Sequence, residues 1–415
     1  MATAARDTDL PPEILDIANP KLWGEFTDLL PYFRRLREAG PVHYCPDSIY
    51  GAYWSVVTGR EIMEVEGNPD VFSSSWERGG ISIAGGRTDI PPERMLPMFI
   101  AMDRPQHTGQ RRTVAPAFTP SEMLRQGPMM RQRTAEVLDS LPVGEDFNWV
   151  EKVSVELTTM MLAMLYDFPW EDRHLLPMWS DVVTDMQSFE DEDINERNWA
   201  EMIRMRDYFG QLWAERVDKE PTPDLISMLI HSAATNNMGP QEFLGNMALL
   251  TVAGNDTTRN SMSAAVMVQN LYPDNWAKMM ADPHLIHNGV SELIRWQSPV
   301  AHMRRTATQD YEIGGKRIRE GDKVVLWYLS ASRDEAMYPD GDVFDPEREN
   351  AKRHLSFGFG IHRCVGYRLA ELQLQMLLEE MHKRDMEVEL TGKPERIYGC
   401  FINGYTRLPV RITRN

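Results

Sequence analysis

The stretch HLSFGFGIHRCVGYRLAELQL, residues 354–374, holds one of the three cysteines in the 415-residue chain. Gly358 and Gly360 precede Cys364 and Gly366 follows it, and glycines there let the backbone turn sharply or admit a flat group. A strongly helical run begins near Gly366, so its free N–H groups and positive dipole end face the sulfur. This arrangement predicts a cysteine thiolate at the start of a helix.

A thiolate in that setting predicts a metal-bearing ligand. A flat ligand explains both the glycines and the helix dipole, and haem with an axial cysteinate is the candidate. His362 and Arg363 directly precede the cysteine and are placed to face acidic groups on such a ligand. A structural zinc site needs four ligands at closed spacing, which His354, His362 and Cys364 do not supply. A dinucleotide-binding turn is rejected because Arg363 replaces the third glycine of its fingerprint.

Composition limits the class of protein and its surroundings. Cys45 and Cys400 are interpreted as small buried apolar residues, and three cysteines fit a reducing cytosol rather than a disulfide framework. The net charge of −18 argues against nucleic acid or an anionic membrane as a partner. Neither a signal peptide nor an apolar run of membrane-spanning length is visible, so we expect a cytoplasmic protein without a membrane anchor.

Helical periodicity dominates the chain, with short strand patterns near both ends. We expect a single domain, 1–415, that is mainly α with small β-sheets. It would have a β-rich N-terminal portion at about 40–75, a helical body at about 100–300 and a cysteine loop at 354–366. Residues 76–95 are rich in glycine, proline and charge and predict a long loop, a kind that is usually functional or disordered.

Residues 240–272 predict one long central helix. It starts with a Gly-Pro pair, ends before Pro273 and would be about 50 Å long. Midway along it lies AGNDTT, residues 253–258, where Gly254 and two adjacent threonines are poor helix formers. A local bulge or opened groove is therefore expected there.

The cysteine stretch resembles the haem-binding signature of the cytochrome P450 superfamily. The match rests on Phe357, Gly360, Cys364 and Gly366. The resemblance implies a triangular helical prism around a buried haem b, with Cys364 as the axial ligand of the iron. It also implies that Phe357, Gly358 and Gly366 lie against the haem.

Two further motifs strengthen this resemblance. Glu292 and Arg295 in ELIR share one helical face, and Arg348 in FDPER best matches the arginine that pairs with them in the family. The resemblance gives this triad a structural role; on its own, ELIR would be read as a surface salt bridge. Asp256 and Thr257 in AGNDTT match the acid–alcohol pair that, in the family, relays protons during the reaction with O2.

Several basic residues match positions that reach the haem propionates in the family. His107 and Arg111 in HTGQR lie four residues apart on one helical face. Arg305 in RRTA fits another propionate contact, with Arg304 as the adjacent alternative, and His362 fits a fourth. Each alone would be read as a solvated basic residue, but together they place cations where two carboxylates need neutralising.

A closer resemblance is to the bacterial alkane and fatty-acid terminal hydroxylases of the superfamily. It rests on MFIAMD, NDTTRNS, ELIRWQSPVAHMRRTA, GDKVVLWY, HLSFGFGIHRCVG, RLAELQL and GYTRLPVRI. Three positions depart from that pattern: Ala253 stands for glycine, Arg104 interrupts an expected Asp-Pro-Pro, and Tyr367 stands for asparagine. Alignment with the family's pocket segments gives five candidate apolar walls: Leu249, Val252, Ala253, Val300 and Phe401.

The resemblance implies a haem-thiolate monooxygenase that hydroxylates a medium-chain alkane or fatty acid, preferentially at the terminal carbon. No flavin or nicotinamide domain is visible, so electrons are expected from a separate ferredoxin and ferredoxin reductase. Alternatives are a hydroxylase of another hydrophobic substrate, such as a terpenoid or steroid, and a haem-thiolate peroxygenase. A haem sensor without enzymatic activity is a further alternative, although no signalling domain is apparent.

A basic segment near the cysteine predicts where the ferredoxin docks. Residues 351–368 contain Lys352, Arg353, Arg363 and Arg368 and no acidic residue, a charge of 4 − 0 = +4. This contrasts with the net charge of −18 of the whole chain. An acidic ferredoxin would therefore be steered to the cysteine-loop side.

Overall fold

The computed structural model describes residues 16–26, 29–86, 91 and 94–414. It is mainly helical with small sheets, which confirms the predicted fold class. The α-helices are α1 (Pro20–Glu25), α2 (Leu29–Ala39), α3 (Gly59–Gly67), α4 (Gln106–Val114), α5 (Pro120–Asp139), α6 (Glu156–Tyr166), α7 (Leu175–Thr184), α8 (Glu192–Arg216), α9 (Leu225–Ile230), α10 (Pro240–Leu271), α11 (Pro273–Ala281), α12 (Pro283–Gln297), α13 (Tyr328–Ala331) and α14 (Tyr367–Lys383). The strands are β1 (Val42–Cys45), β2 (Tyr53–Val56), β3 (Phe72–Ser73), β4 (Asp146–Asn148), β5 (His302–Ala307), β6 (Tyr311–Ile313), β7 (Lys316–Ile318), β8 (Lys323–Trp327), β9 (Glu387–Leu390), β10 (Glu395–Arg396), β11 (Tyr405–Arg407) and β12 (Pro409–Arg414).

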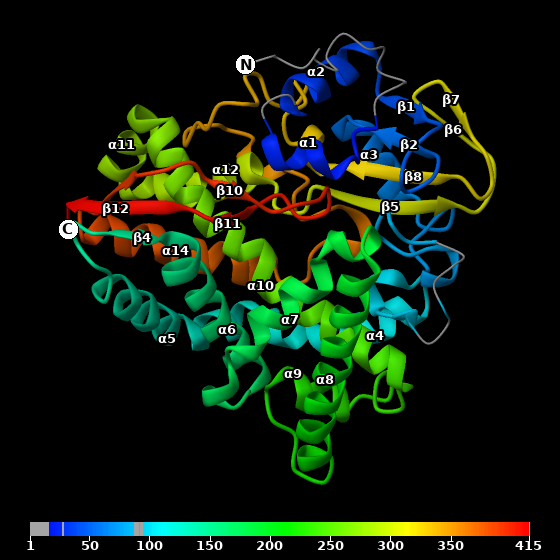
Figure 1. Ribbon diagram of the computed structural model, residues 1–415, viewed down its shortest axis with the longest axis horizontal. Coiled ribbons are helices and arrows are strands. Elements are labelled where there is room, and N and C mark those ends of the chain that lie inside the picture. The colour runs from blue at the N-terminus through cyan, green and yellow to red at the C-terminus, as the bar shows by residue number, and fades with distance from the viewer. Residues whose placement is uncertain (1–15, 27–28, 87–90, 92–93, 415) are drawn as a thin grey trace.

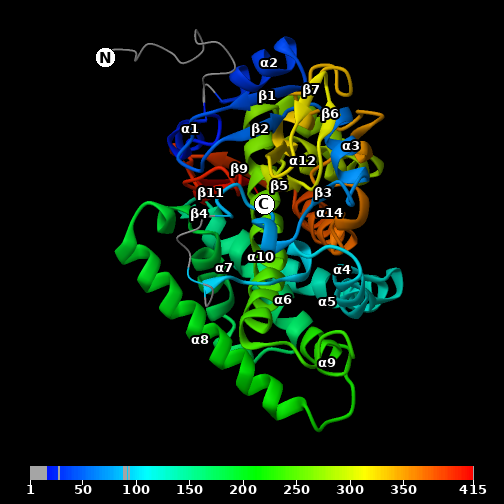
Figure 2. The same ribbon diagram turned by 90° about the vertical axis from the view of Figure 1, so that its right-hand side faces the viewer.

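Helix α10 forms the centre of the molecule. It begins at Pro240, directly after Gly239, and ends at Leu271, within one residue of the predicted boundary. In Figure 2 it runs vertically through the middle of the molecule, from the sheet-bearing upper part into the helical lower part. It packs against α6, α7, α8, α12 and α14, so most of its length is buried.

The bulge predicted in AGNDTT is absent, because α10 is regular α-helix through this segment. Gly254 has a packing role instead: a Cβ at this position would lie 2.7 Å from Cδ1 of Leu162 in α6. A π-helical turn occurs elsewhere, at Val150–Val155, just before α6. The unfavourable helix propensity at Gly254 therefore reflects the close approach of two helices.

The largest sheet combines distant parts of the chain. Its strand order is β1-β2-β8-β5-β3, with β2 and β8 parallel and the other pairs antiparallel. The β-rich N-terminal portion therefore builds its sheet together with strands from residues 302–327. A Gly-Gly turn joins β6 to β7, and both Gly314 (φ 55°) and Gly315 (φ 72°) adopt the left-handed conformation.

Aromatic packing attaches the N-terminal helices to this sheet. The rings of Trp23 and Trp327 stack with centroids 5.8 Å apart, and Phe33 lies 5.6 Å from the same Trp327. Figure 1 shows the sheet at the upper right and helices α5–α9 below it, with α10 between. Within the described part of the chain, every helix is too short or too polar to cross a bilayer.

Candidate active site

A cavity of about 360 Å³ lies between α10 and the loop that carries Cys364. Most residues that the sequence predicts for the site contribute to its wall. These residues are His107, Arg111, Leu249, Val252, Ala253, Thr257, Val300, Arg305, Phe357, Gly358, His362, Cys364, Gly366 and Phe401. They come from many separate segments, so the fold brings them together.

The cysteine loop is shaped by its glycines. Gly358 (φ 68°) and Gly360 (φ 65°) adopt the left-handed conformation, which favours glycine. A Cβ on Gly360 would also overlap the backbone oxygen of Glu66. The backbone N–H of Cys364 donates to the carbonyl oxygen of Phe357 at 2.8 Å and closes the loop. Helix α14 then begins at Tyr367, close to the predicted start.

The electrostatic surroundings of Cys364 only partly favour a thiolate. Burial raises the pKa of the thiol, while the backbone N–H of Gly366 and the guanidinium groups of Arg111 and Arg363 lower it. The burial effect is the largest, so the helix start and nearby arginines do not by themselves ionise this cysteine. A metal cation bound to the sulfur would supply the missing positive charge.

Two histidines at the cavity wall present unused hydrogen-bonding groups. The rings of His107 and His362 lie with centroids 4.2 Å apart. All four of their ring nitrogens are buried and lack a hydrogen-bond partner among the described residues. Burial lowers the pKa of His107 to about 4 and that of His362 to about 2. Unpartnered buried donors are costly, so these rings fit the carboxylates of a haem.

Arg305 faces the same cavity and is held by a buried carboxylate. Its guanidinium donates to Oε1 of Glu66 at 2.9 Å. Glu66 in α3 also accepts hydrogen bonds from the hydroxyl of Tyr328 (2.6 Å) and the backbone N–H of Phe359 (2.8 Å). Sequence reasoning missed Glu66 and Tyr328, because nothing in REIMEVEG distinguishes this glutamate from a surface residue.

Arg304, the adjacent alternative to Arg305 as a propionate contact, is not among the described residues that line the cavity. Its guanidinium donates to the backbone oxygens of Arg78 (3.0 Å), Gly79 (3.2 Å) and Gly85. Successive side chains of a strand point to opposite faces, so in β5 only one of two adjacent arginines can face the cavity. Of the two candidates, Arg305 is that residue.

The predicted acid–alcohol pair is divided between two faces of α10. Thr257 lines the cavity, and its hydroxyl donates to the carbonyl oxygen of Ala253 at 3.2 Å. Asp256 is fully buried and does not appear in the cavity wall among the described residues. Neighbouring residues of a helix point about 100° apart, and the side chain of Asp256 is turned toward Ser180 and Thr184 of α7.

Asp256 is instead bound by several polar groups between α10 and α7. Its carboxylate pairs with Arg259 at 2.9 Å and accepts hydrogen bonds from Ser180 (2.9 Å) and Thr184 (3.0 Å). Burial raises the pKa of Asp256, and Arg259 opposes this effect. Thr184 lines the cavity as well, so it contacts both Asp256 and the cavity. Sequence reasoning missed this threonine.

The triad assigned to a structural role comes together away from the cavity. Arg295 makes two hydrogen bonds of 2.7 Å with the carboxylate of Glu292, and Arg348 adds a third of 3.1 Å. Arg295 also donates to the backbone oxygens of Ser332 (2.5 Å) and Gly341 (2.7 Å). All three charged side chains are buried. The triad therefore joins α12 to the segment before the cysteine loop.

The chain is similar to known proteins of one family. The family model "Cytochrome P450" matches residues 129–384. A linalool 8-monooxygenase from Pseudomonas putida is 34% identical over 405 residues, which cover 95% of this chain and 98% of that protein. A methyl-branched lipid omega-hydroxylase from Mycobacterium tuberculosis is 30% identical over 432 residues, covering 99% of this chain and 98% of that protein.

A solved structure of the same family is similar to this chain at a higher sequence identity. Cytochrome P450-153 from Novosphingobium aromaticivorans is 51% identical, with a TM-score of 0.91 over 96% of this chain and 99% of that one. Together with the cysteine loop and the unpartnered histidines, these similarities identify both the enzyme class and its cofactor. The chain belongs to the cytochrome P450 family and is a monooxygenase whose cofactor is haem b bound through a cysteine thiolate.

Proposed function

We propose that this monooxygenase hydroxylates a linear aliphatic substrate, a medium-chain alkane or fatty acid, preferentially at its terminal carbon. The observation that supports this most is the apolar wall of Leu249, Val252, Ala253, Val300 and Phe401. Terminal C–H bonds are harder to break than their secondary neighbours, so selectivity for them has to come from a narrow cavity that presents the chain end. Burying ten methylenes contributes up to roughly 8 kcal/mol, so a polar anchor is not required.

In the proposed holoenzyme the sulfur of Cys364 would bind the haem iron. His107, His362, Arg111 and Arg305 would bind the haem carboxylates, which would satisfy the unpartnered ring nitrogens. Haem bound to the thiolate supplies the oxidation chemistry with O2. The chain's own residues orient the substrate, exclude water and move protons.

Residues on both faces of α10 transfer protons in the proposed mechanism. The hydroxyl of Thr257 faces the cavity and is placed to donate a hydrogen bond there after leaving the carbonyl of Ala253. Asp256 acts from behind the helix, where Thr184 contacts its carboxylate and also lines the cavity. Because burial raises the pKa of Asp256, this group takes up a proton at a higher pH than an ordinary carboxylate.

An acidic ferredoxin is the proposed electron donor. Lys352, Arg353, Arg363 and Arg368 are all exposed near the cysteine loop. Phe359 is 41% exposed beside them, so the surface combines positive charge with an apolar contact. This pattern suits a partner of opposite charge whose approach is steered by electrostatics.

A terpenoid is the second candidate substrate, because a relative named for linalool shares 34% identity with this chain. NADH-dependent turnover with added ferredoxin and reductase separates the two candidates when octane, dodecanoic acid and linalool are compared by gas chromatography. We expect mainly terminal alcohols from the linear substrates. Mostly in-chain alcohols, or faster turnover of linalool than of any linear chain, would contradict the proposal. Product from peroxide alone at the same rate would indicate a peroxygenase.

A further inference from the structure

The two faces of strand β5 contact different parts of the molecule. Met303 and Arg305 lie on one face and line the cavity. The opposite face of β5 carries polar side chains. Lys323 of the neighbouring strand β8 is paired in register with Thr306 and adds its side chain to this face. We call this group the clasp; its members are His302, Arg304, Thr306 and Lys323.

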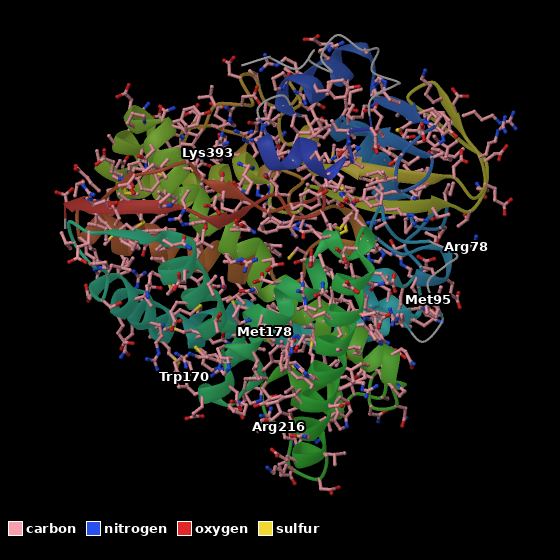
Figure 3. The ribbon with its side chains drawn as sticks, in the orientation of Figure 1. Arg78, Met95, Trp170, Met178, Arg216 and Lys393 are labelled. Atoms are coloured by element: carbon pink, nitrogen blue, oxygen red, sulfur yellow. The ribbon has the colours of Figure 1, made fainter. Side chains whose placement is uncertain are left out.

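The clasp binds the backbone of the loop at residues 78–85. Arg304 and Thr306 both donate to the carbonyl oxygen of Arg78, at 3.0 and 2.8 Å. Arg304 also donates to the carbonyl oxygens of Gly79 and Gly85. One guanidinium therefore joins the two ends of this loop. Arg78 lies on the flank of the molecule, with Met95 on the same side (Figure 3).

The middle of the loop is bound at Ile83. Its carbonyl oxygen accepts from Nζ of Lys323 at 3.0 Å, and its N–H donates to Nε2 of His302 at 3.2 Å. The other ring nitrogen of His302 donates to the carbonyl oxygen of Cys400 at 2.8 Å. The clasp thus holds the loop and the segment before Phe401 against one sheet.

The glycines of the loop fit around Arg304. Gly79 has a φ of 103°, and a Cβ at this position would overlap the guanidinium. A Cβ on Gly86 would lie 3.0 Å from the same group, and one on Gly85 would overlap the carbonyl oxygen of Gly79. One glycine of each Gly-Gly pair in WERGGISIAGG, Gly79 and Gly86, therefore leaves room for the arginine that the loop encloses.

The charge of Arg304 stabilises its hydrogen bonds with the carbonyl groups of the loop. The side chain is buried, and no carboxylate of the described residues pairs with it. Burial lowers its pKa to about 10, so the group stays charged at neutral pH. The loop carbonyls are its main hydrogen-bond acceptors, so moving the loop would leave a buried charge without them.

The loop at residues 78–85, which the clasp binds, forms part of the cavity wall. Ile81 and Ser82 lie between the bound ends and line the cavity, and the N–H of Arg304 donates to the carbonyl oxygen of Ile81 at 2.7 Å. We propose that Arg304 is a positioning residue that fixes this wall and thereby sets which substrates the cavity accepts. This inference does not depend on whether the substrate is a linear chain or a terpenoid.

Replacing Arg304 in the haem-loaded enzyme tests the proposal. In Arg304→Met we expect amide hydrogen exchange at Ile83 and Gly85 to become at least about tenfold faster. Imidazole and 4-phenylimidazole both bind haem iron, but only the phenyl group reaches the cavity walls. We expect the ratio of their affinities to change at least about fivefold, with an unchanged spectrum of the reduced carbon monoxide complex. Arg317→Met, at an arginine whose side chain is 76% exposed, should alter none of these readouts.

Two outcomes would overturn the proposal. Loss of haem or an altered carbon monoxide spectrum with normal exchange at Ile83 would make Arg304 a cofactor contact. Faster exchange with an unchanged affinity ratio would show that the loop does not set selectivity. If Arg304→Met does not fold, Gly79→Ala serves instead, because its methyl group displaces the guanidinium while the charge remains. Gly79→Ala should also speed amide hydrogen exchange in the loop and change the ratio of the two imidazole affinities. If it changes neither, the role proposed for the clasp is refuted.

Discussion

Two parts of the cavity wall are built on different principles. Around Cys364, at the cysteine end, the wall is cationic, with Arg111 and Arg305 beside two histidines, and its backbone is constrained by glycines in the left-handed conformation. The apolar part of the wall is formed by side chains from separate segments, among them Leu249 and Phe401. The cysteine end depends on particular atoms at particular places, whereas the apolar part depends on the shape of the space that it encloses. Substitutions should therefore act differently in the two parts.

The largest effect is expected at the sulfur itself. Cys364→Ser should abolish the red-shifted Soret band of the reduced carbon monoxide complex and lower turnover by about three orders of magnitude or more, because thiolate donation is lost. Cys45→Ser is a suitable control: its Sγ is 3.5 Å from the carbonyl oxygen of Asp47, a contact that serine can keep. A haem-replete Cys364→Ser enzyme with an unchanged band would show that another residue binds the iron.

The scaffold behind the cysteine end should be nearly as sensitive. Arg348→Met leaves the buried carboxylate of Glu292 with one partner fewer, and we expect the free energy of unfolding to fall by about 3–5 kcal/mol. Lys278→Met breaks the ion pair with Glu347, where both side chains are 50% exposed, and should cost at most about 1 kcal/mol. Urea unfolding of the two variants measures the difference. Equal losses would show that the triad is not specially stabilising.

Thr257 also lines the cavity, and its replacement should alter the yield of product more than the binding of substrate. In Thr257→Ala we expect product formed per NADH to fall about tenfold while NADH consumption continues, because the cavity loses its hydroxyl donor. Thr257→Ser retains a hydroxyl and should restore most of the yield. Product, peroxide and NADH are measured in the same reaction. An unchanged yield in both Thr257→Ala and Asp256→Asn would remove the case for proton handling by this pair.

The same contrast explains what the sequence could predict. Cys364 and its glycines were recognisable because this chemistry permits few residue types at few spacings. The boundaries of α10 were recognisable because Gly239 and Pro273 mark them locally. Charge and hydrophobic periodicity act over short stretches, and a single sequence displays them directly.

Tertiary packing decided the features that were predicted wrongly or missed. The bulge expected at Gly254 is absent, since that glycine accommodates Leu162 of another helix. Arg304 and Arg305 are indistinguishable in sequence, and the pleat of β5 assigns them to opposite faces. Glu66 is buried by contacts with residues more than two hundred positions away. Such contacts leave no local pattern to read.

Substitutions in the apolar part of the wall should alter selectivity more than stability or rate. Val300 lines the cavity next to the bridge that it forms with Ile402. Val300→Ala removes two methyl groups from the wall and should raise the ratio of in-chain to terminal alcohol about fivefold, because the chain end is held less tightly. Val343→Ala, at a valine that is 38% exposed on the surface, is the matched control. An unchanged product ratio would mean that this wall does not direct the substrate.

The smallest effect is expected outside the cavity, on the surface that covers the cysteine end. Lys352→Glu combined with Arg353→Glu reverses two exposed charges without touching the cavity wall. At low salt the rate of reduction by an acidic ferredoxin should fall about threefold, since steering depends on opposite charge. The difference should vanish as ionic strength rises and the Debye length shortens to a few ångströms. Stopped-flow reduction measures the rate, and Lys316→Glu in β7 gives a charge reversal elsewhere. If both charge reversals slow reduction equally, overall charge rather than a docking surface beside Cys364 controls the encounter.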